Sequence, residues 1–384
     1  MTLTELSLAQ ALIRAPSPSY RETPAAEVML DAFTRLGFDE RYRDDAGNVV
    51  GVLRRGDGPT VMMNGHLDTV PLGDEALWPH PPLGGEVAED RLWGRGACDM
   101  KSALACMTLA ARDVADGDFS GTLMVTGVVQ EEVGGLGARH LGETVRADVI
   151  ILGEPSKLRL MLGHRGRVEL LVRFEGRIAH AARQELGDNA LYRAVDFLGR
   201  LRELTLPAGG PLGASTVTPT VLKTFPEGGH NVVPGRAELI LDYRNLPGDE
   251  PEAVVRRLQE LAPEASITVP AERSASESGK VMCDLPRIAP PYLAPGENAQ
   301  VTLARAVLQE TLPAHGRDFQ EGVWWFATDA PHLAKTGAVV IGFGPGEEEL
   351  AHTTRESVPL AHLKTARAAY AALARAYLKG GSGV

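Results

Sequence analysis

Histidine and carboxylate side chains follow several apolar, strand-like runs of this chain. The run Thr60–Asn64 leads into the segment GHLDTVP, which places His66 at the end of a strand and Asp68 two residues later. A metal-bound imidazole usually donates its second ring N–H to such a neighbouring carboxylate. The same pair would also suit a surface histidine beside a turn aspartate, so this segment alone leaves both interpretations open.

Asp99 lies in the segment GRGACDMK, where two glycines predict a tight loop just before a helix. An aspartate at the start of a helix can cap it by accepting a backbone N–H. The same carboxylate could instead bridge two cations, because each of its two oxygens can accept one of them.

Two adjacent glutamates, Glu131 and Glu132, follow the apolar run Leu123–Val129 and precede two glycines. Carboxylates that meet at the end of a buried strand repel each other unless a cation or a shared proton relieves the repulsion. A solvated pair of glutamates is the alternative interpretation.

Two more segments of this kind occur later in the chain. Glu154 follows the apolar run Val149–Leu152, and His352 follows the glycine-rich segment Gly342–Gly346. Ligand-binding groups of α/β sheets gather where strands end and loops begin. Histidines together with carboxylate oxygens suit Zn²⁺, with Co²⁺ or Mn²⁺ as substitutes.

The elements that must position these residues alternate between strands and helices in the first part of the chain. Helices are predicted at Leu3–Ala15, Thr23–Leu36, Asp99–Val114 and Leu136–Thr144, and strands at Val49–Leu53, Thr60–Asn64, Thr122–Val129 and Val149–Leu152. This alternation favours an α/β fold with a mixed or parallel sheet that is covered on both faces.

The pattern changes between Val168 and Val269, where the predicted order is strand, helix, strand, strand, helix, strand. This is the order of a small, ferredoxin-like α+β sandwich. The α/β signals return from about Leu285. We therefore expect one catalytic domain made of residues 1–166 and 285–384, with residues 167–284 inserted as a second domain. The tail Gly380–Val384 is predicted to be disordered.

The composition excludes several classes of partner. The 384-residue chain has 44% apolar and 23% charged residues, which is ordinary for a globular protein, and a formal net charge of −11. This negative charge argues against nucleic acid and against an anionic membrane, and no segment approaches the length of a membrane span. Three widely spaced cysteines suit a reducing compartment, so a cytoplasmic location is expected.

Taken in order, GHLDTVP, GRGACDMK, the Glu131-Glu132 pair, the GEPS segment and Ala351-His352 resemble the co-catalytic zinc family of acetylornithine deacetylase, succinyl-diaminopimelate desuccinylase, aminoacylase and carboxypeptidase G. The resemblance runs over nearly the whole chain, inserted domain included. It implies a zinc-exopeptidase-like catalytic domain, an inserted dimerisation domain and a homodimer. It also implies a metal-dependent amidohydrolase or metallopeptidase with two Zn²⁺ per chain.

The resemblance assigns roles to individual residues. It implies five metal ligands for two zinc ions: His66 and Glu154 for one, Glu132 and His352 for the other, and Asp99 as the bridge. It also implies that Asp68 orients His66. Glu131 would be the general base and acid, which takes a proton from water and returns it to the leaving amine.

Further resemblances lie in and near the inserted domain. His180, in GRIAHAARQELGDNA, resembles a histidine that reaches the active site of the partner subunit, although Gln184 or Glu185 stands where a proline is usual. Asn231 and Arg244 resemble substrate-binding residues, and a guanidinium suits a planar carboxylate. A surface salt bridge is the alternative role for Arg244.

The last predicted substrate contact is Thr328, which resembles a residue of the family's substrate-pocket loop. It follows an aromatic run that by itself is more typical of a core. Of the remaining histidines, none is expected to bind metal, and His164 at the domain hinge is expected to line the cleft.

These features predict a zinc-dependent hydrolase that cleaves the amide bond of an N-acyl amino acid, of the deacetylase or desuccinylase kind and with a role in amino-acid biosynthesis. The substrate would be a small N-acyl amino acid or a short peptide. The alternatives are a dipeptidase, aminopeptidase or carboxypeptidase of the same family and, more remotely, a single-metal sensor or a non-catalytic metal-binding protein. The presence of Glu131 beside a full ligand set argues against the last of these.

Overall fold

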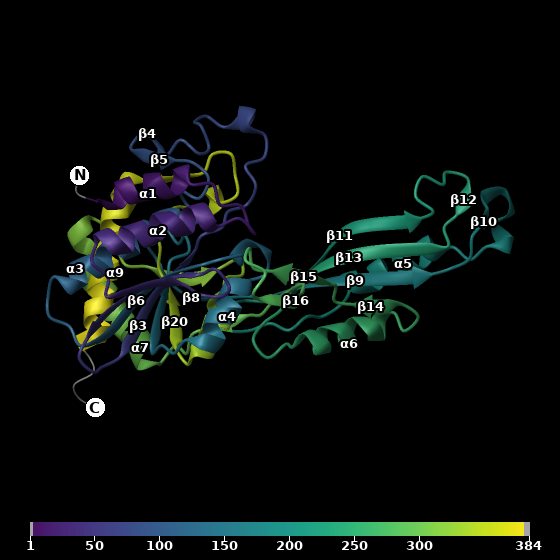
Figure 1. Ribbon diagram of the computed structural model, residues 1–384. Coiled ribbons are helices and arrows are strands. Elements are labelled where there is room, and N and C mark those ends of the chain that lie inside the picture. The colour runs from purple at the N-terminus through teal and green to yellow at the C-terminus, as the bar shows by residue number, and fades with distance from the viewer. Residues whose placement is uncertain (1–2, 380–384) are drawn as a thin grey trace.

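The structure is a computed structural model that describes residues 3–379, so the prediction of disorder for Gly380–Val384 lies outside the described range. Figure 1 shows a large α/β domain that contains both ends of the described chain, and a smaller, elongated α+β domain that projects from one side of it. The smaller domain comes from the middle of the sequence. The predicted fold class, with a second domain inserted into the first, is confirmed.

The large domain is built on a nine-stranded mixed sheet in the order β1-β2-β6-β3-β7-β20-β8-β18, with β19 paired to β8. Its strands are β1 (Glu40–Arg43), β2 (Val49–Arg55), β3 (Thr60–His66), β6 (Gly121–Val128), β7 (Val149–Leu152), β8 (Leu160–His164), β18 (Tyr292–Leu293), β19 (Glu321–Trp324) and β20 (Val339–Gly342). The central strands β6, β3, β7 and β20 are parallel to one another. Their carboxyl ends therefore share one edge of the sheet.

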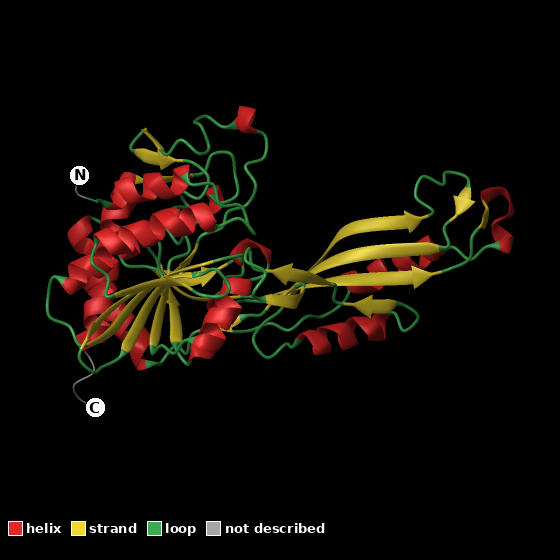
Figure 2. Ribbon diagram, viewed as in Figure 1, coloured by secondary structure: helices red, strands yellow, loops and turns green. Residues whose placement is uncertain are grey.

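Helices cover both faces of this sheet (Figure 2). One face packs against α1 (Glu5–Arg14), α2 (Thr23–Arg35), α3 (Lys101–Ala115), α7 (Ala299–Thr311) and α9 (Leu360–Lys379), and the other against α4 (Leu136–Thr144) and α8 (Ala330–Leu333). Successive residues of β3 enter different cores: Val61 and Met63 pack with the first group, and Met62 packs with the second. A strand that is buried on both faces needs apolar residues in succession, which explains the unbroken apolar run in the sequence.

The small domain has a sheet in the order β11-β13-β9-β14, with β17 beside β9. Its elements are β9 (Arg167–Glu175), α5 (Ala190–Arg202), β11 (Thr216–Phe225), β13 (Arg236–Arg244), α6 (Pro251–Leu261), β14 (Ser266–Thr268) and β17 (Ile288–Ala289). Leu239 and Leu241 of β13 are buried with Phe197 of α5, while Ile240 between them is half-buried. This alternation is typical of a sheet whose helices cover one face.

A hairpin of β15 (Ala271–Ala275) and β16 (Met282–Pro286) lies where the two domains meet (Figure 1). The Ser274 hydroxyl donates a hydrogen bond to Gln130 Oε1 over 2.7 Å, and Gln130 Nε2 donates to the Ala275 carbonyl over 2.9 Å. These bonds fasten the hairpin to the large domain. The predicted domain boundary after residue 284 falls inside β16, and β17 still pairs with the small sheet.

Two small sheets complete the fold. One contains β4 (Glu86–Ala88), β5 (Arg91–Trp93) and β21 (Ser357–Pro359), and the other pairs β10 (Ala179–His180) with β12 (Val232–Val233) at the far tip of the small domain. None of the helices within residues 3–379 is long and apolar enough to cross a membrane.

Candidate functional site

The predicted metal ligands meet at the edge where the parallel strands end. His66 is the last residue of β3, and Glu154 follows β7 by two residues. Glu132 lies in the loop after β6, and His352 lies in the loop after β20. The sheet therefore brings together residues that are far apart in the chain, because parallel strands present their carboxyl ends at one edge.

A first cluster is formed by His66, Asp99 and Glu154. The ring nitrogen Nε2 of His66 lies 2.9 Å from Asp99 Oδ1 and 3.9 Å from Glu154 Oε1. All three residues are buried, and one ligand atom from each lies within 4.8 Å of the others. This donor set, one imidazole and two carboxylates, suits a zinc ion.

A second cluster is formed by Asp99, Glu132 and His352. His352 Nε2 lies 3.0 Å from Glu132 Oε1 and 3.2 Å from the second carboxylate oxygen of Asp99. Their ligand atoms also lie within 4.8 Å of one another. His352 holds a φ of 64°, in the left-handed region that non-glycine residues seldom occupy, and such backbone outliers concentrate at functional sites.

Asp99 belongs to both clusters, and its two oxygens face different histidines. The alternative role of a helix cap does not apply, because the cap residue of α3 is Met100 and its side chain makes no capping hydrogen bond. The backbone N–H of Asp99 donates to Glu356 Oε1 over 3.0 Å, and Glu356 in turn pairs with Arg95 over 2.6 Å. This buried pair fixes the loop that carries Asp99, and no role was predicted for either residue from the sequence.

The Asp68 side chain is arranged differently from the expectation that it orients His66. The ring nitrogen Nδ1 of His66 lies 2.8 Å from the backbone carbonyl of Asp68, whereas the Asp68 carboxylate is 3.7 Å away. The carboxylate instead accepts the backbone N–H groups of Glu131 and Glu132 over 3.0 and 3.2 Å. Asp68 thus holds His66 through its backbone and the two glutamates through its side chain.

The site gathers more carboxyl groups than its two histidines can neutralise. Burial, and next the charge of Asp99, raises the pKa of Glu154 well above its ordinary value. Burial and the nearby Glu154 carboxylate likewise raise the pKa of Glu131. Hydrogen bonds to Asp99 and Glu132 raise the pKa of His352 to about 10. Cations would relieve this repulsion, so the residues present fit a pair of metal ions.

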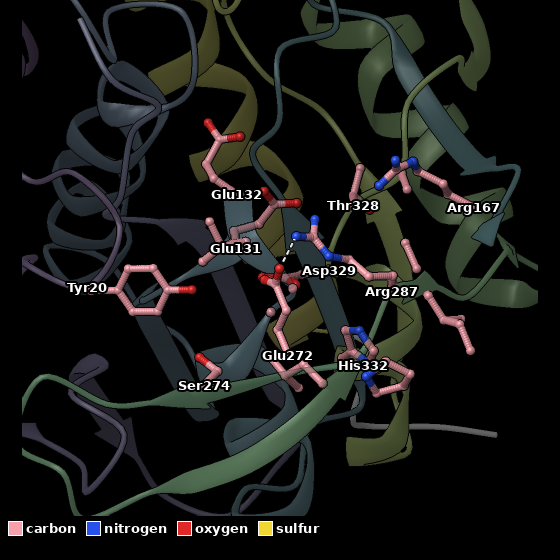
Figure 3. A pocket seen from close by; sticks show the side chains of 18 of the residues that line it. Tyr20, Glu131, Glu132, Arg167, Glu272, Ser274, Arg287, Thr328, Asp329 and His332 are labelled. Carbon is pink, nitrogen blue, oxygen red and sulfur yellow. Dashed lines mark hydrogen bonds and ion pairs between the residues drawn. The ribbon is translucent and has the colours of Figure 1, made fainter. Parts of the chain in front are cut away.

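A cavity of about 340 Å³ opens beside the clusters, between the large domain and the β15–β16 hairpin (Figure 3). Among the residues that line it are the predicted site residues Glu131, Glu132, Arg244 and Thr328. The structure therefore places the predicted base, one ligand and two predicted substrate contacts on a single cavity.

His180 and Asn231 do not lie near this cavity. Both belong to the far tip of the small domain, where β10 pairs with β12 and the Ala181 N–H donates to the Asn231 carbonyl over 2.9 Å. The exposed His180 ring accepts the Ala182 N–H at Nδ1 over 3.0 Å. Asn231 therefore does not contact the cavity of its own chain, and the role expected for His180 at the site of a partner subunit stays a prediction.

His164 was expected to line the cleft, but it is fully buried and accepts the Thr328 N–H at Nε2 over 3.3 Å. His164 thus lies behind the cavity wall and holds the backbone of the lining residue Thr328. His332 is the histidine that lines the cavity, and its position on α8 gave no signal in the sequence.

Several lining residues were not predicted from the sequence: Tyr20, Arg167, Glu272, Ser274, Arg287 and His332. Arg167 donates to Asp242 over 2.6 Å, and Arg287 pairs with Glu272 across the hairpin. They come from several separate segments of the chain, so no single local motif groups them. Asp329, which also lines the cavity, lies in the predicted substrate-pocket loop directly after Thr328.

Comparisons with known proteins show the family of the chain. Residues 62–376 match peptidase family M20/M25/M40. The acetylornithine deacetylase of Myxococcus xanthus is 31% identical over 384 residues, covering 94% of this chain and 93% of that protein. The uncharacterized protein YgeY of Escherichia coli (strain K12) is 29% identical over 383 residues, covering 96% and 93%.

The fold is also that of solved structures. The crystal structure of aminopeptidase PepT from Bacillus cereus superposes with a TM-score of 0.76 at 21% identity, covering 97% of this chain and 98% of that one. At this level of identity the likeness shows a shared fold.

Proposed function

The chain belongs to peptidase family M20/M25/M40 and is a metal-dependent hydrolase of that family; on this premise we propose that it cleaves the amide bond of an N-acyl amino acid that keeps a free carboxylate. The observation that carries the proposal is the position of Asp99 in two three-residue clusters beside a cavity that also holds Glu131 and Arg244. The acyl group would be small, as in an acetyl or succinyl amino acid.

We propose two zinc ions as the resident metals, with cobalt or manganese as substitutes. His66, Glu154 and Asp99 would hold one ion, and Glu132, His352 and Asp99 the other. When bound, such ions lower the pKa of a coordinated water toward about 7 and polarise the carbonyl of the substrate. The support for this assignment is the donor set of two imidazoles and three carboxylates.

Glu131 would move the proton. Its side chain lines the cavity next to Glu132, and its backbone N–H is fixed by the Asp68 carboxylate over 3.0 Å. From that position its carboxylate can take a proton from the attacking water and deliver it to the nitrogen of the leaving amine. Asp68 would act as a positioning residue. Its carboxylate accepts the backbone N–H groups of both Glu131 and the neighbouring ligand Glu132.

Arg244 would bind the substrate carboxylate. It is the last residue of β13, so a strand of the small domain carries it to the cavity wall. Two of its N–H groups are used by Asp242, and a guanidinium has five, so donors are left for a ligand. Thr328, on the large domain, lies on the same cavity. A substrate held between them would span both domains.

We also propose a homodimer joined through the small domains. Large apolar side chains are exposed there: Tyr192 and Val195 of α5 are 64% and 53% exposed, and Leu222 of β11 is 45% exposed. Within the described residues β11 pairs only with β13, so its outer edge is open to a second chain. His180 and Asn231 share the tip of this domain, and in a dimer they would act together at the partner's cavity.

A cytoplasmic location and a role in amino-acid biosynthesis complete the proposal. The location is supported by Cys98, Cys106 and Cys283, which are all free thiols. A dipeptidase or carboxypeptidase is the second candidate, since it would need the same ions, base and carboxylate contact.

A substrate panel separates these activities. N-acetyl and N-succinyl amino acids and matched dipeptides would be compared by kcat/KM in the zinc-loaded enzyme. We expect the N-acyl amino acids to be the better substrates by at least about tenfold, which corresponds to about 1.4 kcal/mol. Faster cleavage of the dipeptides would overturn the deacylase assignment and favour the peptidase.

A further inference from the structure

Tyr20 lines the catalytic cavity with a backbone conformation that tyrosine seldom adopts. The Arg21 N–H donates to the Pro18 carbonyl over 2.9 Å, which closes a four-residue turn with Tyr20 as its third residue. The φ of Tyr20 is 74°. A turn with a positive φ at its third residue favours glycine or asparagine there, because a bulky side chain crowds its own backbone. Residues held in such conformations concentrate at functional sites, so the geometry indicates a functional role for Tyr20.

Packing of the ring does not explain a tyrosine at this position. Tyr20 is 43% exposed, so much of its surface faces the cavity instead of the core. Its hydroxyl forms no hydrogen bond within residues 3–379, and Figure 3 shows it pointing into the cavity. A phenol hydroxyl in this position can donate a hydrogen bond to a ligand.

The turn is fastened to residues that position the proposed base. The buried Glu22 accepts the Tyr20 N–H over 2.8 Å, which holds the turn against its unfavourable φ. The Ser19 hydroxyl donates to Asp68 Oδ2 over 2.8 Å, and the Asp68 carboxylate also accepts the Glu131 N–H over 3.0 Å. Tyr20 is therefore held in a fixed position relative to Glu131.

Tyr20 and the arginines of the small domain enter the cavity from opposite sides. In Figure 3, Glu131 lies between Tyr20 and Arg167. Arg244 belongs to the Arg167 side, because both arginines donate to Asp242 over 2.6 Å. With the substrate carboxylate at Arg244 and the scissile amide beside Glu131, the acyl half of the substrate would extend toward Tyr20.

We propose that the Tyr20 hydroxyl is a further catalytic group, which donates a hydrogen bond to the carbonyl oxygen of the acyl group. This inference rests on the proposed hydrolysis of an amide beside Glu131. The water oxygen bonds to the carbonyl carbon, its proton passes to Glu131, and the π electrons of the C=O bond move to the carbonyl oxygen. That oxygen returns the electrons when the C–N bond breaks and Glu131 gives the proton to the amine. The hydroxyl keeps its own proton throughout, and its hydrogen bond strengthens while the oxygen is charged, which lowers the barrier.

Tyr20→Phe tests the hydroxyl alone, because the variant keeps the ring and the strained turn. The matched control is Tyr42→Phe, since Tyr42 is 41% exposed on β1 and does not line the cavity. For the zinc-loaded wild type and both variants, kcat and KM are measured with N-acetyl, N-propionyl and N-succinyl derivatives of one amino acid and with a dipeptide. A phosphinate analogue of the tetrahedral intermediate is titrated in parallel, which gives a binding readout without turnover.

We expect Tyr20→Phe to lower kcat by about 10- to 100-fold, the range for a hydrogen bond to a charged group. KM should stay within about twofold, because the bond reaches full strength only in the transition state. The loss should be equal for the three acyl groups and the dipeptide, since each presents the same carbonyl. The phosphinate should bind Tyr20→Phe more weakly by a similar factor, and Tyr42→Phe should match the wild type.

Three results would overturn the role of the hydroxyl. They are a kcat of Tyr20→Phe within about twofold of the wild type, a rise in KM with kcat unchanged, and a loss confined to the N-succinyl substrate. The second would make the hydroxyl a contact of the ground state only, and the third would make it a contact of the acyl chain. If no N-acyl amino acid were hydrolysed while the dipeptide was, the proposed function would fail, and the dipeptide rates would still decide the role of Tyr20.

Discussion

Asp242 accepts hydrogen bonds from Arg244 over 2.6 Å and from Arg167 over 2.6 Å, so one carboxylate aligns two arginines of the small domain at the cavity wall. Both guanidinium groups keep further N–H donors for a ligand. Arg244 therefore does more than form a surface salt bridge, because the guanidinium that pairs with Asp242 belongs to a residue that lines the cavity.

Arg244→Ala should therefore lower kcat/KM for N-acyl amino acids by about 10- to 100-fold, because it removes a charge-assisted contact to the substrate carboxylate. Arg244→Lys should recover only part of this loss, since a point charge cannot form the paired hydrogen bonds of a guanidinium. Initial rates with free and amide-capped substrates would be compared. Equal hydrolysis of the two by the wild type would contradict a role in carboxylate selection.

Glu131→Gln should reduce kcat by about 10²–10⁴-fold, the usual contribution of general acid–base catalysis. Glu131 belongs to neither metal cluster, so the variant should keep its metal content, measured by elemental analysis, and its melting temperature. A variant that keeps its metal and turns over near the wild-type rate would place the base elsewhere.

A dimer that shares its active sites should show complementation between two inactive variants. Glu131→Gln chains lack the base, and His180→Ala chains lack the exposed histidine at the tip of the small domain. Mixed dimers would contain one site with both groups intact, so part of the activity should return after subunit exchange. Exchange followed by fluorescence energy transfer serves as the control. If subunits exchange and no activity returns, His180 has no role across the dimer.

The pH dependence of stability should contain a contribution from Glu22, which is buried beside the loop of Asp68. Burial, and next the charge of Asp68, raises the pKa of Glu22 from 4.5 to about 7. A carboxyl group with a raised folded-state pKa binds more protons in the folded state. Its stabilising contribution is complete below the unfolded value and is lost as the pH rises through about 7.

Glu22→Gln removes this ionisation and keeps an acceptor for the Tyr20 N–H, which donates to Glu22 over 2.8 Å. The variant should be more stable than the wild type at pH 8, by on the order of 1–3 kcal/mol, and nearly equal to it at pH 5. Denaturant unfolding at both pH values measures the difference. A gain that is the same at pH 5 and pH 8 would contradict a buried ionisable Glu22.

The sequence predicted the parts of the site that lie in contiguous segments. His66 ends an apolar strand, and Glu131 and Glu154 lie three and two residues beyond one. Because parallel strands end at one edge of a sheet, the convergence of these residues could be anticipated. The hydrogen-bond partners of the Asp99 and Asp68 side chains could not be anticipated. Whether Asp99 caps a helix or faces two histidines depends on loop geometry, and the preference of the Asp68 carboxylate for two backbone N–H groups depends on how the β6 loop folds back.

The remaining lining of the cavity could not be derived from local sequence either. Arg167, Glu272 and Asp329 come from a strand of the small domain, a hairpin and a loop of the large domain, and they meet only through tertiary packing. His180 is the opposite case. Its segment resembles a functional one, but the site at which we propose it acts belongs to a second chain, which a single sequence does not place.

We propose that hydrolysis needs two metal ions, which the two clusters would hold with Asp99 as their shared residue. The most direct measurement is a titration of the chelated protein with zinc, in which bound metal and the hydrolysis of an N-acyl amino acid are followed together. We expect no turnover in the metal-free protein and full activity at roughly two ions per chain, because both clusters take part in the chemistry. Full activity without metal, or a plateau at one ion per chain with the second cluster empty, would contradict the account.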